Sequence, residues 1–351
     1  MKFPRLVAVL LSVLLLLSAV SVPAYADTLN AQQEIDSICE HYQKNLKEIT
    51  TAQQVILFGS VGAIRGKKIP DVRIDSASDE INDAATILAR LALETDPAAA
   101  WDDGTDPLTD LSSRQREDGS FGDLLTTVYA ASALQAAQIF VGEEKTVYSA
   151  KGVTDFLLAR QEENGSFGTL YETARTLSYL SCFSQDKNVK AAITKAVEYL
   201  RDQQTETGGF EEKDIRTLCA VICALKDTEQ DLMTSTWHYM PQLLADYRNE
   251  DGTYRNLPED EKVFSDEATM AALEALDAQL SAKSALKKLT THGVYRINIW
   301  NGIKNFVYVY GALALLALIF WGYILFGKKK TVDAPAEETG ETYESENHPD
   351  L

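Results

Sequence analysis

Apolar residues recur every three or four positions through the middle of this chain, which is the spacing that places them on one face of an α-helix. No stretch alternates apolar and polar residues as a half-buried strand would. The pattern therefore predicts an all-α protein. The helical stretches cover residues 33–58, 79–93, 124–140, 147–161, 170–183, 193–204, 215–225, 237–248 and 264–280, with a short extra helix over 281–289.

A short motif recurs between these stretches, and its copies divide the chain into units of similar length. Each copy has a glutamine or arginine, a glycine four residues later and an aromatic residue two positions after the glycine. Successive glycines are 46, 43 and 44 residues apart. The copies are Gln115, Gly119 and Phe121; Gln161, Gly165 and Phe167; Gln204, Gly208 and Phe210; and Arg248, Gly252 and Tyr254.

The motif has a physical reading at the end of a helix. Glycine adopts a left-handed backbone without a Cβ clash, so it suits the position just after a helix C-terminus. The glutamine amide can bond the carbonyl groups left unsatisfied there, and Arg248 could stack against a ring instead. With a degenerate earlier unit, the pattern predicts about five helix hairpins between residues 30 and 282.

Two copies extend to a longer pattern that resembles a known family. They read Lys151-Gly152-x-x-x-Phe156-Leu157-x-x-x-Gln161-x-x-x-Gly165-x-Phe167 and Lys195-Ala196-x-x-Tyr199-Leu200-x-x-x-Gln204-x-x-x-Gly208-x-Phe210. The pattern is similar to the QW repeat of the squalene-hopene cyclase and prenyltransferase superfamily, with Phe where that family prefers Trp. The resemblance implies an (α/α) toroid, in which inner and outer helices alternate around a central cavity. Cobalamin carriers and thioester-containing domains resemble the same toroid, so function stays open.

The two ends of the chain predict a location at a membrane. Residues 1–26 are typical of a secretory signal, with basic residues, an apolar run and the small-x-small sequence Ala24-Tyr25-Ala26. Residues 306–327 contain no charged side chain and are long enough to span a bilayer, and three lysines follow them. The alternatives are an uncleaved N-terminal anchor and a buried core helix.

These segments predict a single-pass cell-membrane protein with its helical domain outside the cell and its acidic tail in the cytoplasm. The boundaries are a signal peptide over 1–26, an extracellular toroid domain over 27–290, a juxtamembrane linker over 291–305, a transmembrane helix over 306–327 and a basic stop with an acidic disordered tail over 328–351.

The charge of the chain bears on its partners. With 33 Lys and Arg against 52 Asp and Glu, its formal net charge is −19. A nucleic-acid-binding protein needs a surplus of basic side chains on some surface to neutralise phosphates. We therefore exclude nucleic acid, and expect the membrane and an unknown small molecule, peptide or surface protein as partners.

No predicted helix of this sequence carries a catalytic motif of the resembled superfamily. There is no D-x-D-D motif to protonate an alkene. The letters D-D-x-x-D occur at Asp102, Asp103 and Asp106, but in an expected loop, so no helix presents this motif to hold Mg²⁺. Cys219 and Cys223 lie one helical turn apart and His238 follows, but in apolar stretches such cysteines are typically core residues. We predict no metal site and no cofactor, and the catalytic residues, if any, are unknown. The pairing of the four cysteines Cys39, Cys182, Cys219 and Cys223 stays open.

One group of acidic residues recurs at the starts of the helices that follow the glycines. Its members are Asp123, Glu172, Asp214 and Asp266. The simpler interpretation is helix capping. In a toroid, however, the inner helices begin at one mouth of the cavity, where these acids would form a negative rim that selects a cationic ligand.

The sequence thus leaves three functions open. A non-catalytic binding module is the first. The second is an enzyme acting on an isoprenoid or other apolar substrate, with Asp214 or Asp266 as its acid. The third is a binding protein similar to the cobalamin carriers.

Overall fold

The computed structural model describes residues 29–64, 71–72, 83–100, 104–141 and 147–292. Of the described residues, 61% are helical and 2% lie in strands, which confirms the all-α prediction. All described residues belong to one compact unit, Met1–Tyr295. The predicted signal peptide, the transmembrane helix over 306–327 and the acidic tail lie outside the described residues.

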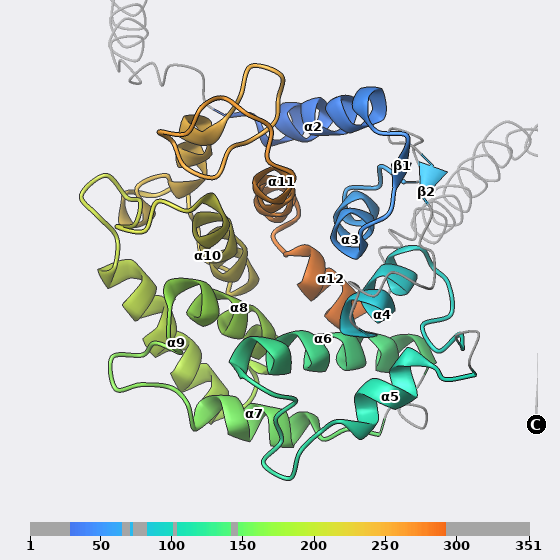
Figure 1. Ribbon diagram of the computed structural model, residues 1–351. Helices are drawn as coiled ribbons and strands as arrows, with labels where there is room; N and C mark the ends of the chain where they lie inside the picture. The colour runs from blue at the N-terminus through green and yellow to red at the C-terminus, as the bar shows by residue number, and fades with distance from the viewer. Residues whose placement is uncertain (1–28, 65–70, 73–82, 101–103, 142–146, 293–351) are drawn as a thin grey trace, which may run out of the picture. The chain divides into compact units, whose positions relative to one another are not determined.

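Six inner helices contact one another in a closed cycle (Figure 1). In cyclic order they are α3 (Ala52–Ser60), α4 (Asp83–Ala92), α6 (Leu124–Val141), α8 (Leu170–Leu180), α10 (Ile215–Asp227) and α11 (Asp266–Ser281). Each helix packs against the next, and α11 packs against α3. Because an inner helix has neighbours on several sides, most residues of α8, α10 and α11 are buried, and these include polar side chains.

Helix α6 shows how this packing affects composition. Within the described part of the chain it alone is long and apolar enough to cross a membrane, and half of its most apolar window is buried inside the unit. It packs against α4, α5, α7, α8 and α12 (Ala285–His292). Alanines such as Ala131, Ala133 and Ala137 are fully buried there, so the apolar sequence of α6 is that of a core helix in this structure.

Outer helices cover the inner ones (Figure 1). They are α2 (Ala31–Asn45), α5 (Pro107–Ser113), α7 (Ala150–Leu158), α9 (Lys187–Asp202) and two 3₁₀ helices, Ser235–Trp237 and Met240–Tyr247. The sequence predicted an α-helix over 237–248, but His238 and Tyr239 have left-handed backbones and Pro241 lacks an N–H group. These three residues interrupt a regular helix at its start.

The first expected helix, over 33–58, is divided into α2 and α3. Leu46 ends α2 in an extended conformation, and the chain then forms the two-residue strand β1 (Glu48–Ile49). This strand pairs in parallel with β2 (Asp71–Val72). The division lets α2 join the outer helices while α3 joins the inner ones.

Each motif glycine lies where its turn meets the next outer helix. Their φ angles are 88°, 96°, 86° and 82° for Gly119, Gly165, Gly208 and Gly252, which confirms the predicted left-handed backbone. A Cβ at Gly165 would lie 2.4 Å from the carbonyl oxygen of Lys195 in α9. The sequence placed these glycines directly after helix ends, whereas they lie in turns beyond them, because contact with the following helix also requires a residue without a side chain.

The motif glutamines connect the motif turns to the outer helices that follow them. The amide nitrogen of Gln161 donates to the carbonyl oxygens of Gly165 at 3.0 Å and of Ala192, in α9, at 2.8 Å. Gln115 likewise donates to Gly119 and to Ser149, the N-cap of α7. Gln115 and Gln161 therefore join their own turns to the helix of the following unit, whereas Gln204 donates to Arg201 of α9 and to Thr236 of the following unit.

The last unit makes the corresponding contacts with α2, the first helix among the described residues. Gly252 packs against Ser37 of α2. Arg248, in the position of the glutamines, forms an ion pair with Glu34 of α2 at 2.5 Å. Tyr254 also donates from its hydroxyl to Glu34. The motif thus joins the two ends of the helical series.

Candidate functional site: a cavity among the inner helices

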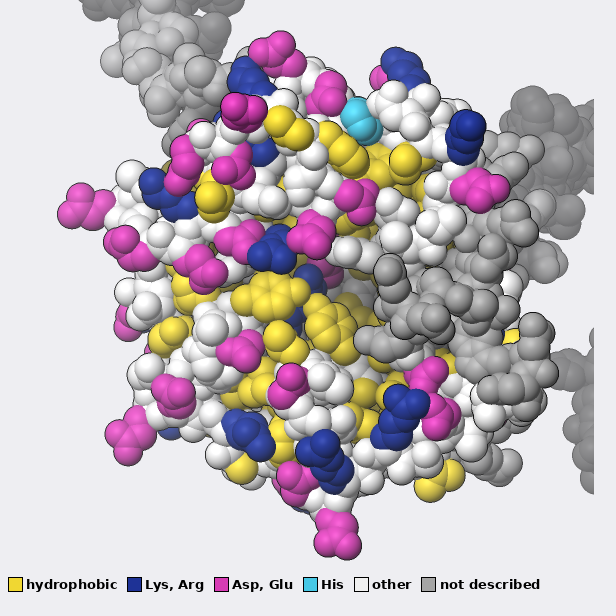
Figure 2. All heavy atoms as spheres, in the orientation of Figure 1, with side chains coloured by type: hydrophobic (Ala, Val, Ile, Leu, Met, Phe, Trp, Pro, Cys, Tyr) yellow, Lys and Arg dark blue, Asp and Glu magenta, His cyan; other side chains and the backbone are white. Residues whose placement is uncertain are grey.

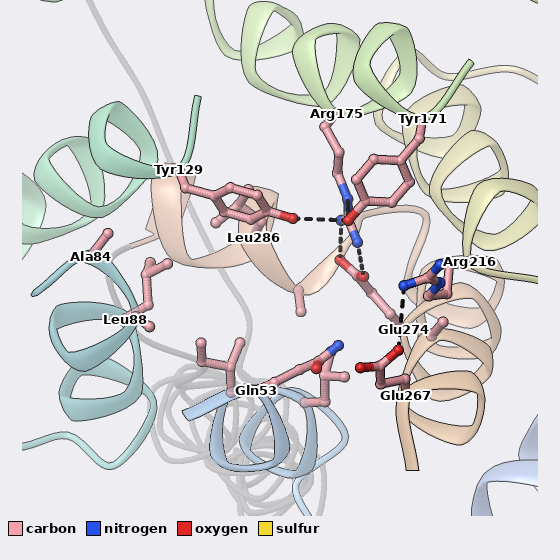
Figure 3. Close-up of a pocket in the computed structure, with 15 residues that line it drawn as sticks. Gln53, Ala84, Leu88, Tyr129, Tyr171, Arg175, Arg216, Glu267, Glu274 and Leu286 are labelled. Carbon is pink, nitrogen blue, oxygen red and sulfur yellow. Dashed lines mark hydrogen bonds and ion pairs between the residues drawn. The ribbon is translucent and has the colours of Figure 1, made fainter. Parts of the chain in front are cut away.

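A cavity of about 400 Å³ lies between the inner helices, toward the ends at which several of them begin (Figure 3). Volumes of this order are typical of small-molecule sites. In the same orientation as Figure 1, the surface is hollowed near the centre of the face, where hydrophobic and charged side chains lie together (Figure 2). The two walls of the cavity differ in chemistry.

One wall is mainly apolar and comes from α3, α4 and α12, with Gln53 of α3 as its polar residue. Its apolar side chains are Ile56, Leu57, Ala84, Ala85, Leu88, Ala285 and Leu286. Helix α12 lies near the centre of the cycle in Figure 1, where it contacts α3, α4, α6 and α11. It therefore supplies one surface of the cavity from inside the cycle, a role that sequence spacing did not indicate for the short helix expected over 281–289.

The opposite wall contains a buried ion pair between α8 and α11. The guanidinium of Arg175 donates to both carboxylate oxygens of Glu274, at 3.1 and 3.0 Å. The two side chains are only 10% and 7% exposed. Burial alone would lower the pKa of Arg175, but the charge of Glu274 more than compensates and raises it, so the guanidinium stays charged.

Two tyrosine hydroxyls continue this polar chain into the cavity (Figure 3). The Nε of Arg175 donates to the Tyr171 hydroxyl at 3.3 Å, and the Tyr171 and Tyr129 hydroxyls are 3.2 Å apart. The Arg175 guanidinium also lies 5.3 Å from the centre of the Tyr171 ring. Burial raises the pKa of Tyr129 above its ordinary value, so this phenol keeps its proton at neutral pH.

Arg216, at the start of α10, forms a second charged group on this wall. It bonds Asp214 through three hydrogen bonds of 2.7 to 3.2 Å and reaches Glu267 of α11 at 3.3 Å. The hydrogen bond to Asp214 raises the pKa of Arg216. Its side chain and that of Glu267 are exposed, so this group borders solvent.

The four acids predicted to form a rim are engaged in local contacts and do not line this cavity. Glu172 completes a capping box with Thr169 at the start of α8. Asp123 accepts from the backbone N–H of Thr126, and this bond lowers the pKa of Asp123. Both residues thus cap their helices, as the simpler interpretation predicts.

The other two acids hold elements together. Asp214 caps α10 and pairs with Arg216. Asp266, at the start of α11, accepts hydrogen bonds from the Tyr42 hydroxyl of α2 and, at 2.9 Å, from the Gln54 amide of α3. Selection of a cationic ligand by these acids stays a prediction, but each carboxylate already has a partner in the fold.

The sequence reasoning missed the residues of the polar wall: Tyr129, Tyr171, Arg175 and Glu274. A signal was present for two of them, because Arg175 and Glu274 are charged residues within stretches whose neighbours are apolar or small. Charged side chains are rarely fully buried unless they are paired, so a charge on an inner helix indicates a partner on another. The tyrosines carried no comparable signal.

Three of the four cysteines lie in the core, and Cys182 is half-buried. Cys219 and Cys223 are fully buried free thiols on α10, and burial raises their pKa values. Cys182, also a free thiol, is 3.4 Å from the Thr290 hydroxyl of α12. Among the residues that the structure describes, no group of three or more histidine, cysteine or acidic side chains could hold a metal ion.

Comparison with known proteins adds no assignment to this geometry. No protein-family model matches the chain, and no curated protein matches its sequence. The chemistry of the cavity therefore has to be argued from its own residues.

Proposed function

We propose that this chain is a membrane-anchored, cell-surface binding protein whose helical unit is an (α/α) toroid with a small-molecule site at its centre. The closed cycle of inner helices, the outer helices around it and the repeated glycine turns support the toroid. The anchor rests on the apolar segment 306–327 and the lysines after it.

The observation that carries the binding function is the division of the cavity into an apolar and a polar wall. Small-molecule sites typically combine a mainly apolar surface with a few placed polar groups. Here α3, α4 and α12 supply the apolar side, and the hydroxyls of Tyr129 and Tyr171 supply polar atoms held in place by Arg175. A buried ion pair behind the tyrosines fixes their positions before any ligand arrives.

The geometry favours binding over the cyclase-like alternative. A catalytic acid must carry a proton on one carboxyl oxygen and direct it at the substrate. Glu274 is the buried acid of this cavity, and both of its oxygens accept hydrogen bonds from Arg175. Asp214 and Asp266, the acids considered for that role, bond Arg216 and the pair Tyr42 and Gln54 instead.

Native mass spectrometry of the mature chain, residues 27–351 in lipid nanodiscs, tests the proposal. The protein would be incubated with cell extract and then washed. We expect a mass increment from a retained small molecule. Ala271, which lines the cavity from α11, is replaced by leucine to reduce its volume, and the A271L variant should lose the increment.

The matched control is A159L, the same substitution at an exposed position after α7. This variant should retain the ligand. Absence of any increment in the wild-type protein, or an equal increment in A271L, would contradict binding in the cavity.

A further inference from the structure

The two tyrosines of the polar wall leave one hydrogen-bond donor without a partner. Each phenol has a single hydroxyl hydrogen. The bond between Tyr129 and Tyr171 uses one of the two, whichever residue donates, and Tyr171 accepts from Arg175. The second hydroxyl hydrogen has no acceptor among the hydrogen bonds of the described residues, and both tyrosines line the cavity.

The wall that presents this donor has its charges balanced. Arg175 and Glu274 satisfy each other through two hydrogen bonds, and nearby Arg216 is bonded by Asp214 and Glu267. A charged ligand group would therefore find no unpaired opposite charge on this wall. Desolvation of such a group is costly unless an opposite charge compensates for it. The cavity therefore favours a neutral polar atom.

The apolar side chains of the cavity determine the chemistry of the remainder of the ligand. Leu88 of α4 and Leu286 of α12 are buried apolar residues that line the same cavity, and Leu286 lies beside the Tyr129 ring in the view of Figure 3. A hydrocarbon chain or ring placed against them is removed from water, which is favourable in proportion to the buried area. A ligand that contacts both the tyrosine hydroxyls and these leucines has an accepting oxygen attached to an apolar body.

We infer that the cavity takes an uncharged carbonyl compound, such as a ketone or an ester with a hydrocarbon chain, whose oxygen accepts the hydrogen bond offered by the Tyr129 and Tyr171 hydroxyl pair. This inference rests on the proposed binding function and defines its ligand class. Tyr129 and Tyr171 are then the residues that select the ligand, and Arg175 positions them.

The test uses three probes with the same chain length and different heads: octan-2-one, octanoate and octylammonium. Each is titrated calorimetrically into the mature chain in nanodiscs, with empty nanodiscs as the reference for partition into lipid. We expect octan-2-one to bind tightest. Tighter or equal binding of either charged probe would overturn the inference, because the cavity would then supply an unpaired counter-charge.

Hydroxyl removal tests the donor itself. In the double variant Y129F/Y171F, both rings remain and both hydroxyls are lost. We expect the double variant to bind octan-2-one roughly three- to tenfold more weakly, as for the loss of one hydrogen bond. Y199F, which changes a tyrosine on outer helix α9, should bind as the wild-type protein does. Unchanged affinity in the double variant would overturn the role of the hydroxyls.

The failure of this inference can be distinguished from failure of the proposed function. If none of the three probes binds, the inference is wrong. The binding function still stands if the wild-type protein retains a molecule from extract that A271L loses. If neither extract nor probes yield a ligand, both are wrong.

Discussion

At the scale of single residues, the motif glycines satisfy two requirements at one position. Their backbones are left-handed, and their Cα atoms lie against another helix. A residue with a Cβ is strained in a left-handed backbone, and its Cβ would collide with the adjacent helix. The spacing of the motif therefore marks contacts between units, in addition to the turns within them.

Replacing Gly165 with alanine should separate these two requirements. In G165A the new Cβ meets the Lys195 carbonyl at 2.4 Å, so we expect a loss of about 3 kcal/mol from strain and overpacking combined. Gly62 has a φ of +70°, and no atom lies within 4 Å of the position that a Cβ would occupy, so G62A should lose only about 1 kcal/mol. Urea unfolding of both variants measures the difference. Equal losses would show that the inter-helix contact contributes nothing.

The residues of the cavity were not predictable at this scale, whereas acids at helix starts were. Asp123, Glu172, Asp214 and Asp266 were found because residues at a helix start act within a few positions of one another, but none of them lines the cavity. The pair Arg175 and Glu274 lies 99 positions apart, and no local spacing links two such residues. A sequence can show that each charge is out of place in an apolar helix, but not which partner it meets.

At the scale of elements, α12 is held in the cycle by a buried carboxylate. Asp227, at the end of α10, accepts from the backbone N–H and the hydroxyl of Ser284, both at 2.7 Å, and Ser284 caps α12. Lys287 lies beside the same carboxylate and bonds the Asp227 carbonyl oxygen. Burial raises the pKa of Asp227 to about 6, against the lowering effects of Ser284 and Lys287.

This carboxyl should make the protein more stable as the pH falls from about 6 to about 4. An unfolded aspartate titrates near pH 4. Between these values the folded state binds the proton more tightly, so acidification raises the free energy of unfolding through this group. Relative to D227N, we expect the wild-type protein to gain up to about 3 kcal/mol across that window.

Urea unfolding at pH 6.5 and pH 4 measures the gain. Burial also raises the pKa of Asp83 to about 6. Because Asp83 is present in both proteins, its contribution cancels in the comparison with D227N. Parallel pH dependence in the two proteins would show that Asp227 is not the group responsible.

The positions of the helices were predicted correctly from the sequence where a helix has a strong apolar face. The expected stretch 170–183 corresponds to α8 with a short 3₁₀ turn after it, and 215–225 corresponds to α10. The seven-residue α5 was not expected, because it is too short to establish a period. The division of 33–58 into α2 and α3 was also missed, since both halves carry the same apolar spacing.

At the scale of the whole described unit, closure depends on contacts between α2 and the last repeat. Arg248 and Glu34 form the ion pair, with Tyr254 as a third partner. The Arg248 side chain is 37% exposed and Glu34 only 11%. Water can replace the partner of the arginine, whereas the carboxylate would be left buried.

Removal of the two partners should therefore have unequal effects. We expect R248M to lower the free energy of unfolding by about 2 kcal/mol more than E34Q does, because only R248M leaves a buried charge without its ion-pair partner. Hydrogen exchange should show the loss of protection concentrated in α2 and α11. Loss spread evenly over all helices, or a larger effect in E34Q, would argue against this account of closure.

The contacts between α2 and the last repeat also determine when α2 can pack in its native position during synthesis. The hydrogen bonds from Tyr42 and Tyr254 that join α2 to the last repeat link residues 224 and 220 positions apart. Contacts so distant in the chain form late and slow the approach to the native state. Helix α2 is synthesised before the other described helices, yet it must wait for nearly the whole helical unit, with the apolar residues Ile38 and Tyr42 uncovered. The early helix is therefore the part of the nascent chain most in need of protection from aggregation.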